Sequence, residues 1–256
     1  MTAILLVASC SDEGPIVIDF SNLVWEDDFE GPAGQLPDPN RWSFDTGTNW
    51  GNNQLEYDTD RPENASLDGA GHLVITAREE SYQGQPYTSA RIVTRDLFEP
   101  TYGLFEARIQ LPVGRGIWPA YWLLGADFET VSWPACGEID IMEYIGHIPN
   151  VVYATVHGPG YSGGGGISDH YTLANGTFDE GFHIFSVSWT VGNISWYVDG
   201  NHVFSVTPGD LPGEWVFDHP FYIILNLAVG GNWPGAPDEN TVFPQTMLID
   251  WVRVYQ

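Results

Sequence analysis

The stretch Gly137-Glu138-Ile139-Asp140-Ile141-Met142-Glu143-Tyr144 places three carboxylic acids within six residues, between apolar residues that are typical of a buried strand. Strict alternation along a strand puts Glu138 and Asp140 on one face of the sheet and Glu143 on the other. A lone, unpaired carboxylate on an apolar face is strongly disfavoured. One extra residue near Ile141-Met142, a β-bulge, returns Glu143 to the face of the other two acids. We therefore expect a bulged strand whose three acids line one face of a cleft.

The acidic run resembles E-[IL]-D-[IF]-x-E, the signature of glycoside hydrolase family 16, and Met142 resembles the extra residue of its laminarinase-like members. Further segments are similar to that family: Gly116–Leu124, Thr155–Gly158, Asn226–Gly235 and Ile249–Tyr255. The resemblance covers nearly everything after about residue 24. It implies a β-jelly-roll sandwich of two curved antiparallel sheets with a concave substrate cleft.

The rest of the sequence also indicates an all-β fold. Runs with period-two alternation or β-branched residues recur from Leu23 onward, and no helical pattern exceeds a turn or two. The predicted strands are His72–Arg78, Ser89–Thr94, Leu104–Leu111, Val151–His157, Ile184–Trp189, Ser195–Val198, His202–Val206, Phe221–Val229 and Met247–Tyr255. The pairs Gly192-Asn193 and Asp199-Gly200 predict the turns of a three-stranded meander. Two packed, curved sheets accommodate strands of this number and length.

The first residues read as a targeting segment. Residues 1–10 are apolar and end in Val7-Ala8-Ser9-Cys10, which resembles the lipobox of a bacterial lipoprotein. The run is too short to span a bilayer as a helix. It lacks the usual positive charge, so secretion without a lipid is the alternative. We expect a signal and short tether over 1–22, a single catalytic β-sandwich domain over 23–256, and a secreted or outer-surface lipoprotein of a bacterium.

The charge balance excludes some partners. The 256 residues carry 34 acidic and 8 basic side chains, all of the latter Arg, for a net charge of -26. Nucleic acids and anionic membranes bind through basic patches, so neither is an expected partner. Membrane contact is expected only through a lipid at Cys10. Sulfated polysaccharides are disfavoured, although a local Arg cluster would override the overall field. We expect a monomer that acts on a polysaccharide.

The acids divide into roles by resemblance: Glu138 is the nucleophile and Glu143 the acid/base of a retaining glycosidase. Such enzymes hold two carboxyl groups about 5–5.5 Å apart. Asp140 lies between them, and crowding of like charges is expected to raise one pKa in the group. A calcium loop of acidic residues is a poor alternative, because such loops are irregular and this stretch is apolar between its acids.

Three features near the acids have two readings each. By resemblance His157 lies near the catalytic acids, and a core histidine with satisfied partners is the other reading. The neighbouring acids are expected to raise the pKa of the Cys136 thiol, so we interpret Cys136 as a packing residue rather than a nucleophile. The Gly-rich segment Tyr161–Ile167 is either a loop at the cleft rim or a surface loop without substrate contact.

Several side chains are candidates for binding sugar. Aromatic faces stack on the C–H side of pyranose rings while polar groups bond the hydroxyls. The resemblance implies a cleft lined by Asn49, Arg91, Trp118, Trp122 and Trp133, with Asn232 and Trp233 as further candidates. The alternative for each of these tryptophans is that it packs in the hydrophobic core and does not contact sugar.

The resemblance also implies a structural Ca²⁺ on the convex side, held by Asp250 with backbone oxygens near Glu30 and Gly71. Hard oxygen ligands suit this ion. A solvated aspartate at a strand end is the plain alternative for Asp250. No cofactor is expected for catalysis.

The sequence therefore predicts an endo-acting hydrolase of β-1,3-glucan, such as laminarin, that works by retaining double displacement. One alternative is the same chemistry on mixed-linkage glucan, agar or carrageenan. The other is a non-catalytic glucan-recognition module, which would not need both Glu138 and Glu143.

Overall fold

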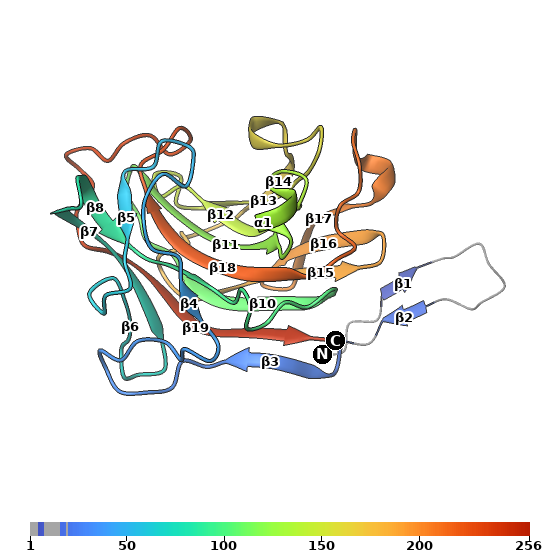
Figure 1. Cartoon of the computed structure of the whole chain (residues 1–256), viewed down its shortest axis with the longest axis horizontal. Helices are drawn as coiled ribbons and strands as arrows, with labels where there is room; N and C mark the ends of the chain where they lie inside the picture. Colours follow the sequence, from blue (N-terminus) through green and yellow to red (C-terminus); the bar gives the residue numbers. More distant parts are fainter. Residues whose placement is uncertain (1–4, 8–15, 19) are drawn as a thin grey trace.

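The computed structural model describes residues 5–7, 16–18 and 20–256, and two stacked β-sheets dominate it (Figure 1). The larger sheet has the strand order β17-β16-β15-β10-β19-β7-β8-β5, with β3 beside β19 and β6 beside β7. The smaller sheet has the order β14-β13-β12-β11-β18-β9-β4. Cys10 lies outside the described residues, so its lipidation stays a prediction. No helix in the described part of the chain has the length and apolar character needed to cross a membrane.

Strands of both sheets alternate along the chain. The larger sheet contains β3 (Leu23–Asp27), β5 (Glu56–Asp58), β6 (Ala65–Leu67), β7 (Leu73–Tyr82), β8 (Gln85–Ser89), β10 (Gly103–Gln110), β15 (His183–Thr190), β16 (Asn193–Val198), β17 (Asn201–Val206) and β19 (Gln245–Tyr255). The smaller sheet contains β4 (Ser43–Phe44), β9 (Arg91–Val93), β11 (Ile117–Gly125), β12 (Glu138–Tyr144), β13 (Val151–His157), β14 (Ile167–Thr172) and β18 (Phe221–Val229). The remaining elements are a separate antiparallel pair, β1 (Leu5–Val7) with β2 (Ile16–Ile18), and three helical turns, α1 (Phe128–Val131), η1 (Gly163–Gly165) and η2 (Pro208–Asp210).

The predicted all-β fold is confirmed. Within the described residues the strands of the two large sheets pair antiparallel, apart from the parallel pair of β5 with β8. The predicted meander is present as β15, β16 and β17. Val198 pairs with Asn201, and Asp199 and Gly200 between them have φ of 50° and 75°. Positive φ at both loop residues is the mark of a type I′ hairpin turn, which matches the twist of its strands.

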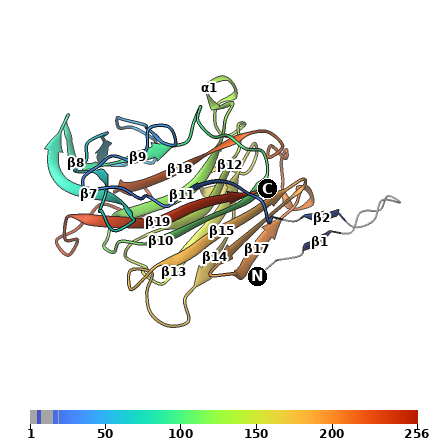
Figure 2. The ribbon, with the colours of Figure 1, turned by 90° about the horizontal axis from the view of Figure 1, so that it is seen from below.

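The hydrophobic core lies between the two sheets. In β10 every second residue is buried, namely Phe105, Ala107 and Ile109, whereas β18 is buried along almost its whole length. Figure 2 shows β19, β10 and β15 side by side in the larger sheet. Each large apolar side chain removed from water contributes about 1.5–3 kcal/mol. The core side chains thus hold the inner face of the smaller sheet in place. The side chains on its outer face are not needed for this core and can line a cleft.

The predicted bulge in β12 is confirmed by its register against β11. Asp140 lies opposite Trp122 and Met142 lies opposite Tyr121, so the extra residue is Ile141 and not Met142, which the resemblance had indicated. Both Ile141 and Met142 are buried in the core between the sheets. Two consecutive inward side chains reverse the alternation, and the acid that follows them returns to the outer face.

The bulge is tied to the opposite sheet. The indole N–H of Trp196, in β16, donates a buried hydrogen bond of 2.8 Å to the backbone carbonyl of Asp140. The Trp196 ring is itself stacked on Phe204, with ring centroids 4.4 Å apart. Because a bulge disrupts its own strand ladder, a side chain from across the core stabilises the backbone where the ladder is weakest.

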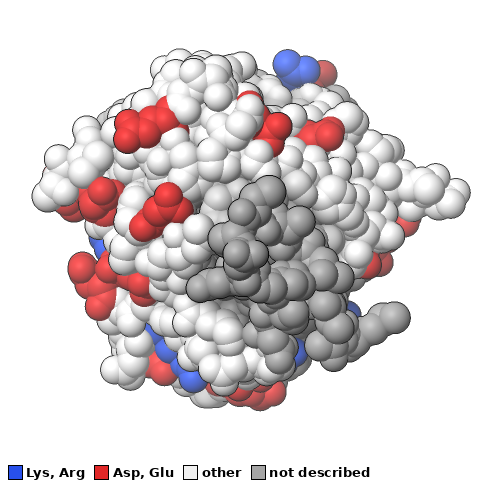
Figure 3. Space-filling view, turned by 90° about the vertical axis from the view of Figure 1, so that its right-hand side faces the viewer, with Lys and Arg blue, Asp and Glu red and all other residues white. Residues whose placement is uncertain are grey.

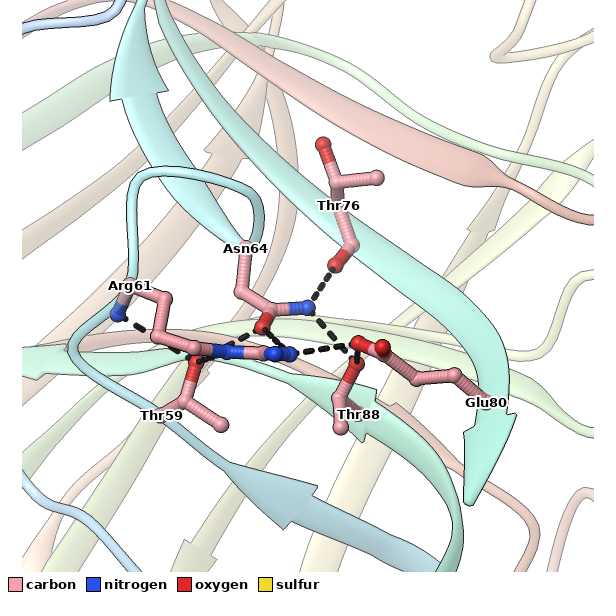
Figure 4. A network of polar contacts seen from close by, with 6 residues as sticks. All are labelled: Thr59, Arg61, Asn64, Thr76, Glu80 and Thr88. Carbon is pink, nitrogen blue, oxygen red and sulfur yellow. Dashed lines mark hydrogen bonds and ion pairs between the residues drawn. The ribbon is translucent and has the colours of Figure 1, made fainter. Parts of the chain in front are cut away.

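A network of polar side chains fixes the part of the larger sheet from which the chain passes to the smaller sheet (Figure 4). The buried amide of Asn64 donates to the carbonyl of Thr76 and to the hydroxyl of Thr88, each at 3.0 Å. Its oxygen accepts from Thr59 and Arg61, and Arg61 also pairs with Glu80. The network holds the loop between β5 and β6 against β7 and β8. Since β8 leads directly into β9 of the other sheet, the network also fixes where β9 begins.

The overall charge is visible on the surface. On the face shown in Figure 3, acidic side chains are scattered over the molecule and basic ones are few. This agrees with the net charge of -26.

Replacing Trp196 with Phe should test the link between the sheets. The variant keeps an aromatic ring in the core but leaves the Asp140 carbonyl without its donor, so we expect the free energy of unfolding to fall by about 1–3 kcal/mol. Urea unfolding measures this. Trp215→Phe is the matched control, because its indole bonds an exposed carboxylate, that of Asp218. Equal stability of wild type and Trp196→Phe would contradict a structural role for this hydrogen bond.

Candidate active site

A cleft of about 650 Å³ lies on the outer face of the smaller sheet. Its floor is formed by β9, β11, β12 and β18, and its rim includes α1, which stands above these strands in Figure 1. The acids Glu138, Asp140 and Glu143 all line this cleft. The bulge therefore brings the three predicted catalytic acids to one surface.

His157 meets two of these acids. It lies directly opposite Glu138 in the ladder between β12 and β13, so both side chains project from the same face. Its Nε2 is 3.3 Å from Oδ2 of Asp140 and 3.6 Å from Oε1 of Glu138. The structure thus supports the reading that places His157 beside the acids, although His157 is also buried.

Glu143 is held from another side. The indole N–H of Trp118, in β11, donates to Oε1 of Glu143 at 3.2 Å. Trp118 is almost fully buried, so it restrains the carboxyl group more than it offers a ring face to a ligand. A side chain predicted to bind sugar is here also a hydrogen-bond donor to an acid.

Burial raises the pKa of all three acids. It raises the pKa of Asp140 to about 8, and burial followed by the charge of Asp140 raises the pKa of Glu143 to about 8. The same two causes, in the same order, raise the pKa of Glu138 well above its ordinary value. We expected crowding to raise one pKa in the group. Instead all three are raised, and loss of hydration rather than crowding is the largest cause.

Arg91 and Trp122 lie together at the end of the cleft away from β13. The Arg91 guanidinium lies between two indoles, 4.9 Å from the ring centroid of Trp50 and 4.8 Å from that of Trp122. Trp122 donates to the side-chain oxygen of Asn226 at 2.8 Å. One face of Trp122 is therefore taken by the cation, and a sugar would meet its other parts or Trp50.

Asp45 offsets part of the positive charge of the two arginines at this end of the cleft. Its carboxylate lies 3.2 Å from Nε of Arg91 and accepts a hydrogen bond of 2.6 Å from Arg95. Two guanidinium groups thus share one carboxylate, and the local positive charge is reduced accordingly.

The remaining predicted sugar-binding residues differ in position. Trp133 lines the cleft, 42% exposed, with its ring centroid 6.1 Å from that of His157. Asn49 is exposed and does not line the cleft, whereas the adjacent Trp50 does. Asn232 and Trp233 lie outside the enclosed part. The side-chain oxygen of Asn232 accepts from Asn53 at 2.8 Å, which joins two loops of the cleft wall.

Sequence reasoning missed several residues of the cleft. They are Asp45, Trp50, Asn52, Gln54, Arg95, Tyr222 and Asn226. Trp50 follows the predicted Asn49, and Asn226 opens a segment that resembles the family, so both carried a signal. Asp45 and Arg95 carried none, because only the fold brings β4 and the end of β9 to the cleft.

The Gly-rich loop reaches the rim of the site. A Cβ atom at Gly166 would lie 2.4 Å from Cε1 of His157, so only glycine allows the loop to approach the imidazole this closely. At the other end of the loop, Tyr161 is buried and its hydroxyl donates to the carbonyl of Glu214. The reading of this segment as a rim loop is therefore the better one.

Cys136 is a packing residue, as predicted. Its side chain is fully buried in a small cluster with Leu124 and Tyr222. Burial, with smaller effects from Asp127 and Glu138, raises the pKa of the thiol to about 12. A thiol in this state is a poor nucleophile.

A comparison with known proteins agrees with this geometry. The sequence profile of the family described as glycosyl hydrolases family 16 matches residues 45–253. The chain belongs to glycoside hydrolase family 16. A beta-glucanase of Rhodothermus marinus is 42% identical over 91% of this chain and 85% of its own length.

Solved structures give the same assignment. The laminarinase catalytic domain of Thermotoga maritima is 50% identical, with a TM-score of 0.86 over 91% of this chain and 97% of that domain. The endo-β-1,3-glucanase of Pyrococcus furiosus is 47% identical, with a TM-score of 0.86 over 91% and 94% of the two chains. The predicted family and its β-jelly roll are thereby confirmed.

The residues that suggested a metal site in this family 16 protein lie at the larger sheet, where Asp250 belongs to β19 and Gly71 precedes β7. Glu30 and Gly71 are neighbours, since Oε1 of Glu30 lies 3.5 Å from the position of a Cβ on Gly71. One carboxylate oxygen of Asp250 pairs with Arg108, and the other lies 3.8 Å from Nε2 of His72. Asp250 is linked to Gly71 through His72, the next residue in the chain, and Arg108 competes with a cation for one oxygen of Asp250.

The raised pKa of Glu143 has a cost in stability that can be measured. The folded protein holds a proton on Glu143 up to about pH 8, whereas the unfolded chain releases it near 4.5, so rising pH between these values favours unfolding. Glu143→Gln removes this cost and keeps an oxygen for Trp118. At pH 8 we expect the variant to be more stable than wild type, on the order of 1–2 kcal/mol after solvent screening.

Thermal melts at pH 4 and pH 8 measure this effect, and the gain should vanish at pH 4. Glu239→Gln, at an exposed acid outside the cleft, is the control and should show no gain at either pH. A gain that is equal at both pH values would show that the raised pKa is not its cause.

Proposed function

We propose that the protein is an endo-acting hydrolase of β-1,3-glucan. The observation that carries the proposal is the bulged β12, which sets Glu138, Asp140 and Glu143 on one face of a cleft. Glycoside hydrolysis needs a pair of carboxyl groups of this kind. The similarity to proteins named laminarinase, beta-glucanase and endo-β-1,3-glucanase supports glucan as the substrate.

In the proposed mechanism Glu143 and Glu138 act in two steps. Glu143 gives its proton to the glycosidic oxygen while a carboxylate oxygen of Glu138 bonds to the anomeric carbon, and the bond to the leaving sugar breaks. Water then attacks the anomeric carbon, Glu143 takes its proton, and Glu138 is released. The anomeric configuration is retained, and no cofactor takes part in either step.

The surroundings of each acid suit these roles. A pKa of about 8 keeps a proton on Glu143 at neutral pH, which a general acid requires. Trp118 fixes the position of that carboxyl group, and His157 lies where it can orient Glu138 and Asp140. For the attack Glu138 must be ionised, and the charges of His157 and Arg91 favour its carboxylate by opposing the rise in its pKa.

Two alternative functions have less support. A non-catalytic glucan-recognition module would not need both Glu138 and Glu143 in the cleft. For sulfated chains such as carrageenan, a local Arg cluster would have to override the net charge of -26. Arg91 and Arg95 do meet in the cleft, but they share Asp45 and so offer less charge to a sulfate.

Acid substitutions should separate the two roles. We expect wild type to cut laminarin into short oligosaccharides, and faster than lichenan, agarose or κ-carrageenan. Glu138→Ala should abolish hydrolysis, and azide should restore turnover of an activated substrate with inversion. Glu143→Ala should keep the first step on substrates with good leaving groups, which need no proton, while laminarin cleavage collapses. Product sizing and reducing-end assays measure these outcomes.

The stereochemistry gives an independent check. Proton NMR should show a β-anomer as the first reducing end formed by wild type from a β-linked glucan. An α-anomer would mean inversion, and would contradict the roles of Glu138 and Glu143. Faster cleavage of κ-carrageenan than of laminarin would contradict the assigned substrate.

We further propose that the site at the larger sheet binds a structural Ca²⁺ through Asp250 and carbonyl oxygens near Glu30 and Gly71. A ligand that binds only the folded state raises its stability by mass action, so the Tm should be higher in Ca²⁺ than in chelator. Asp250→Ala should abolish this difference. Arg108→Gln should enlarge it by removing the competing cation, and Arg253→Gln, on the same sheet, serves as the control. Equal Tm values for wild type with and without chelator would refute the site.

A further inference from the structure

The enclosed part of the cleft lies on one side of the catalytic acids. Among the described residues that line it, none belongs to β13 or β14. An endo-acting enzyme holds sugar units on both sides of the bond that it cuts. The surface of β13 and β14, beyond Glu143, therefore has to receive the other half of the chain, and no residue there has been assigned to this task.

The strand register places two aromatic side chains on that surface. Tyr153, in β13, lies directly opposite Glu143, and His170, in β14, lies directly opposite Tyr153. Directly opposed residues in an antiparallel pair share a face of the sheet. A line from Glu143 through Tyr153 to His170 thus crosses three strands, which is about 10 Å at the usual strand spacing.

The side chains along this line form a continuous row. The ring of Trp233 contacts that of Tyr153, with centroids 4.8 Å apart, and is 40% exposed. The ring of His170 lies 6.1 Å from that of Tyr153, and its side chain is 57% exposed. Trp118, which holds Glu143, contacts Trp233 at 5.8 Å. Tyr153, between the rings of Trp233 and His170, is partly buried. Single exposed rings are common on proteins, but a partly exposed row that begins at a catalytic acid is not explained by packing alone.

We propose that Trp233, Tyr153 and His170 form the binding subsite for the leaving part of the glucan chain. The proposal rests on the proposed function, because it assigns a direction to the same cleft. Glu143 protonates the oxygen of the leaving sugar, and Tyr153 is its direct neighbour across the ladder, so the leaving chain lies over β13 and β14. The enclosed end with Arg91 then holds the sugars that become attached to Glu138.

The chemistry of the row fits a neutral β-linked glucan. Aromatic rings stack against the C–H side of a pyranose ring, while the imidazole of His170 offers hydrogen bonds to hydroxyl groups. The carboxylate of Asp169 lies 3.4 Å from Nδ1 of His170 and is half exposed, so it adds an acceptor beside the ring. Such a row binds sugar without requiring charge on the substrate.

Two substrates that differ in their leaving group test the row. One is laminarihexaose, which would occupy it, and the other is β-laminaribiosyl fluoride, whose leaving group is a single atom and would not. Tyr153→Ala and His170→Ala should each lower kcat/KM for the hexaose roughly five- to tenfold, the effect expected for one lost ring contact. Hydrolysis of the fluoride should change by less than about twofold, because its transition state gains nothing from the row.

The larger sheet supplies a matched control. Tyr197 and His202 are also a directly opposed Tyr/His pair, with ring centroids 5.5 Å apart. Tyr197→Ala and His202→Ala should leave both substrates unaffected. In a Glu138→Gln background, which holds the intact hexaose, calorimetry should show the same weakening of binding for Tyr153→Ala and His170→Ala.

The outcomes distinguish the row from the proposed function. Equal losses on both substrates, or no loss on the hexaose, would overturn the row while leaving the glucanase in place. Failure of wild type to cut any β-1,3-glucan would overturn the proposed function, and the row with it. Selective loss on the hexaose, with normal binding in the control variants, would establish the row.

Discussion

Three carboxyl groups on one buried strand are compatible with a stable sheet only if the strand departs from regular alternation, and the bulge at Ile141-Met142 provides that departure. It adds two apolar side chains to the core and sends Glu143 to the cleft. The carbonyl at this point is bonded by Trp196 from the opposite sheet. The position of the acids therefore depends on the packing of both sheets, and not on the smaller sheet alone.

Burial gives this site its chemistry and also its cost. Removing Glu138, Asp140 and Glu143 from water raises the pKa of each, which keeps protons in the cleft at neutral pH. The same effect makes the folded state less stable as pH rises. A loss of stability of this kind is common at functional sites, and the large core between the sheets compensates for it.

The sequence predicted the features that depend on local pattern. Alternating strands, the Asp199-Gly200 turn and the bulge in β12 follow from side-chain periodicity and the cost of burying a charge. The partners of Arg91 were not predictable, because Asp45 and Trp50 reach it only through the pairing of β4 with β9. The sequence shows how closely the three acids are spaced but not how deeply they are buried. It therefore suggested crowding of like charges, and not burial, as the cause of the raised pKa.

The cleft wall has a consequence for how the protein is made. Asn53 and Asn232, which join two wall loops, are 179 residues apart, and β3 pairs with β19 at the far end of the chain. Contacts over such distances form late, because closing a long loop costs entropy before the contact repays it. During synthesis the acids of β12 emerge long before their cleft can close around them. A nascent chain at that stage would expose apolar sheet faces, and they stay exposed until β19 has been synthesised and can pair with β3, β7 and β10.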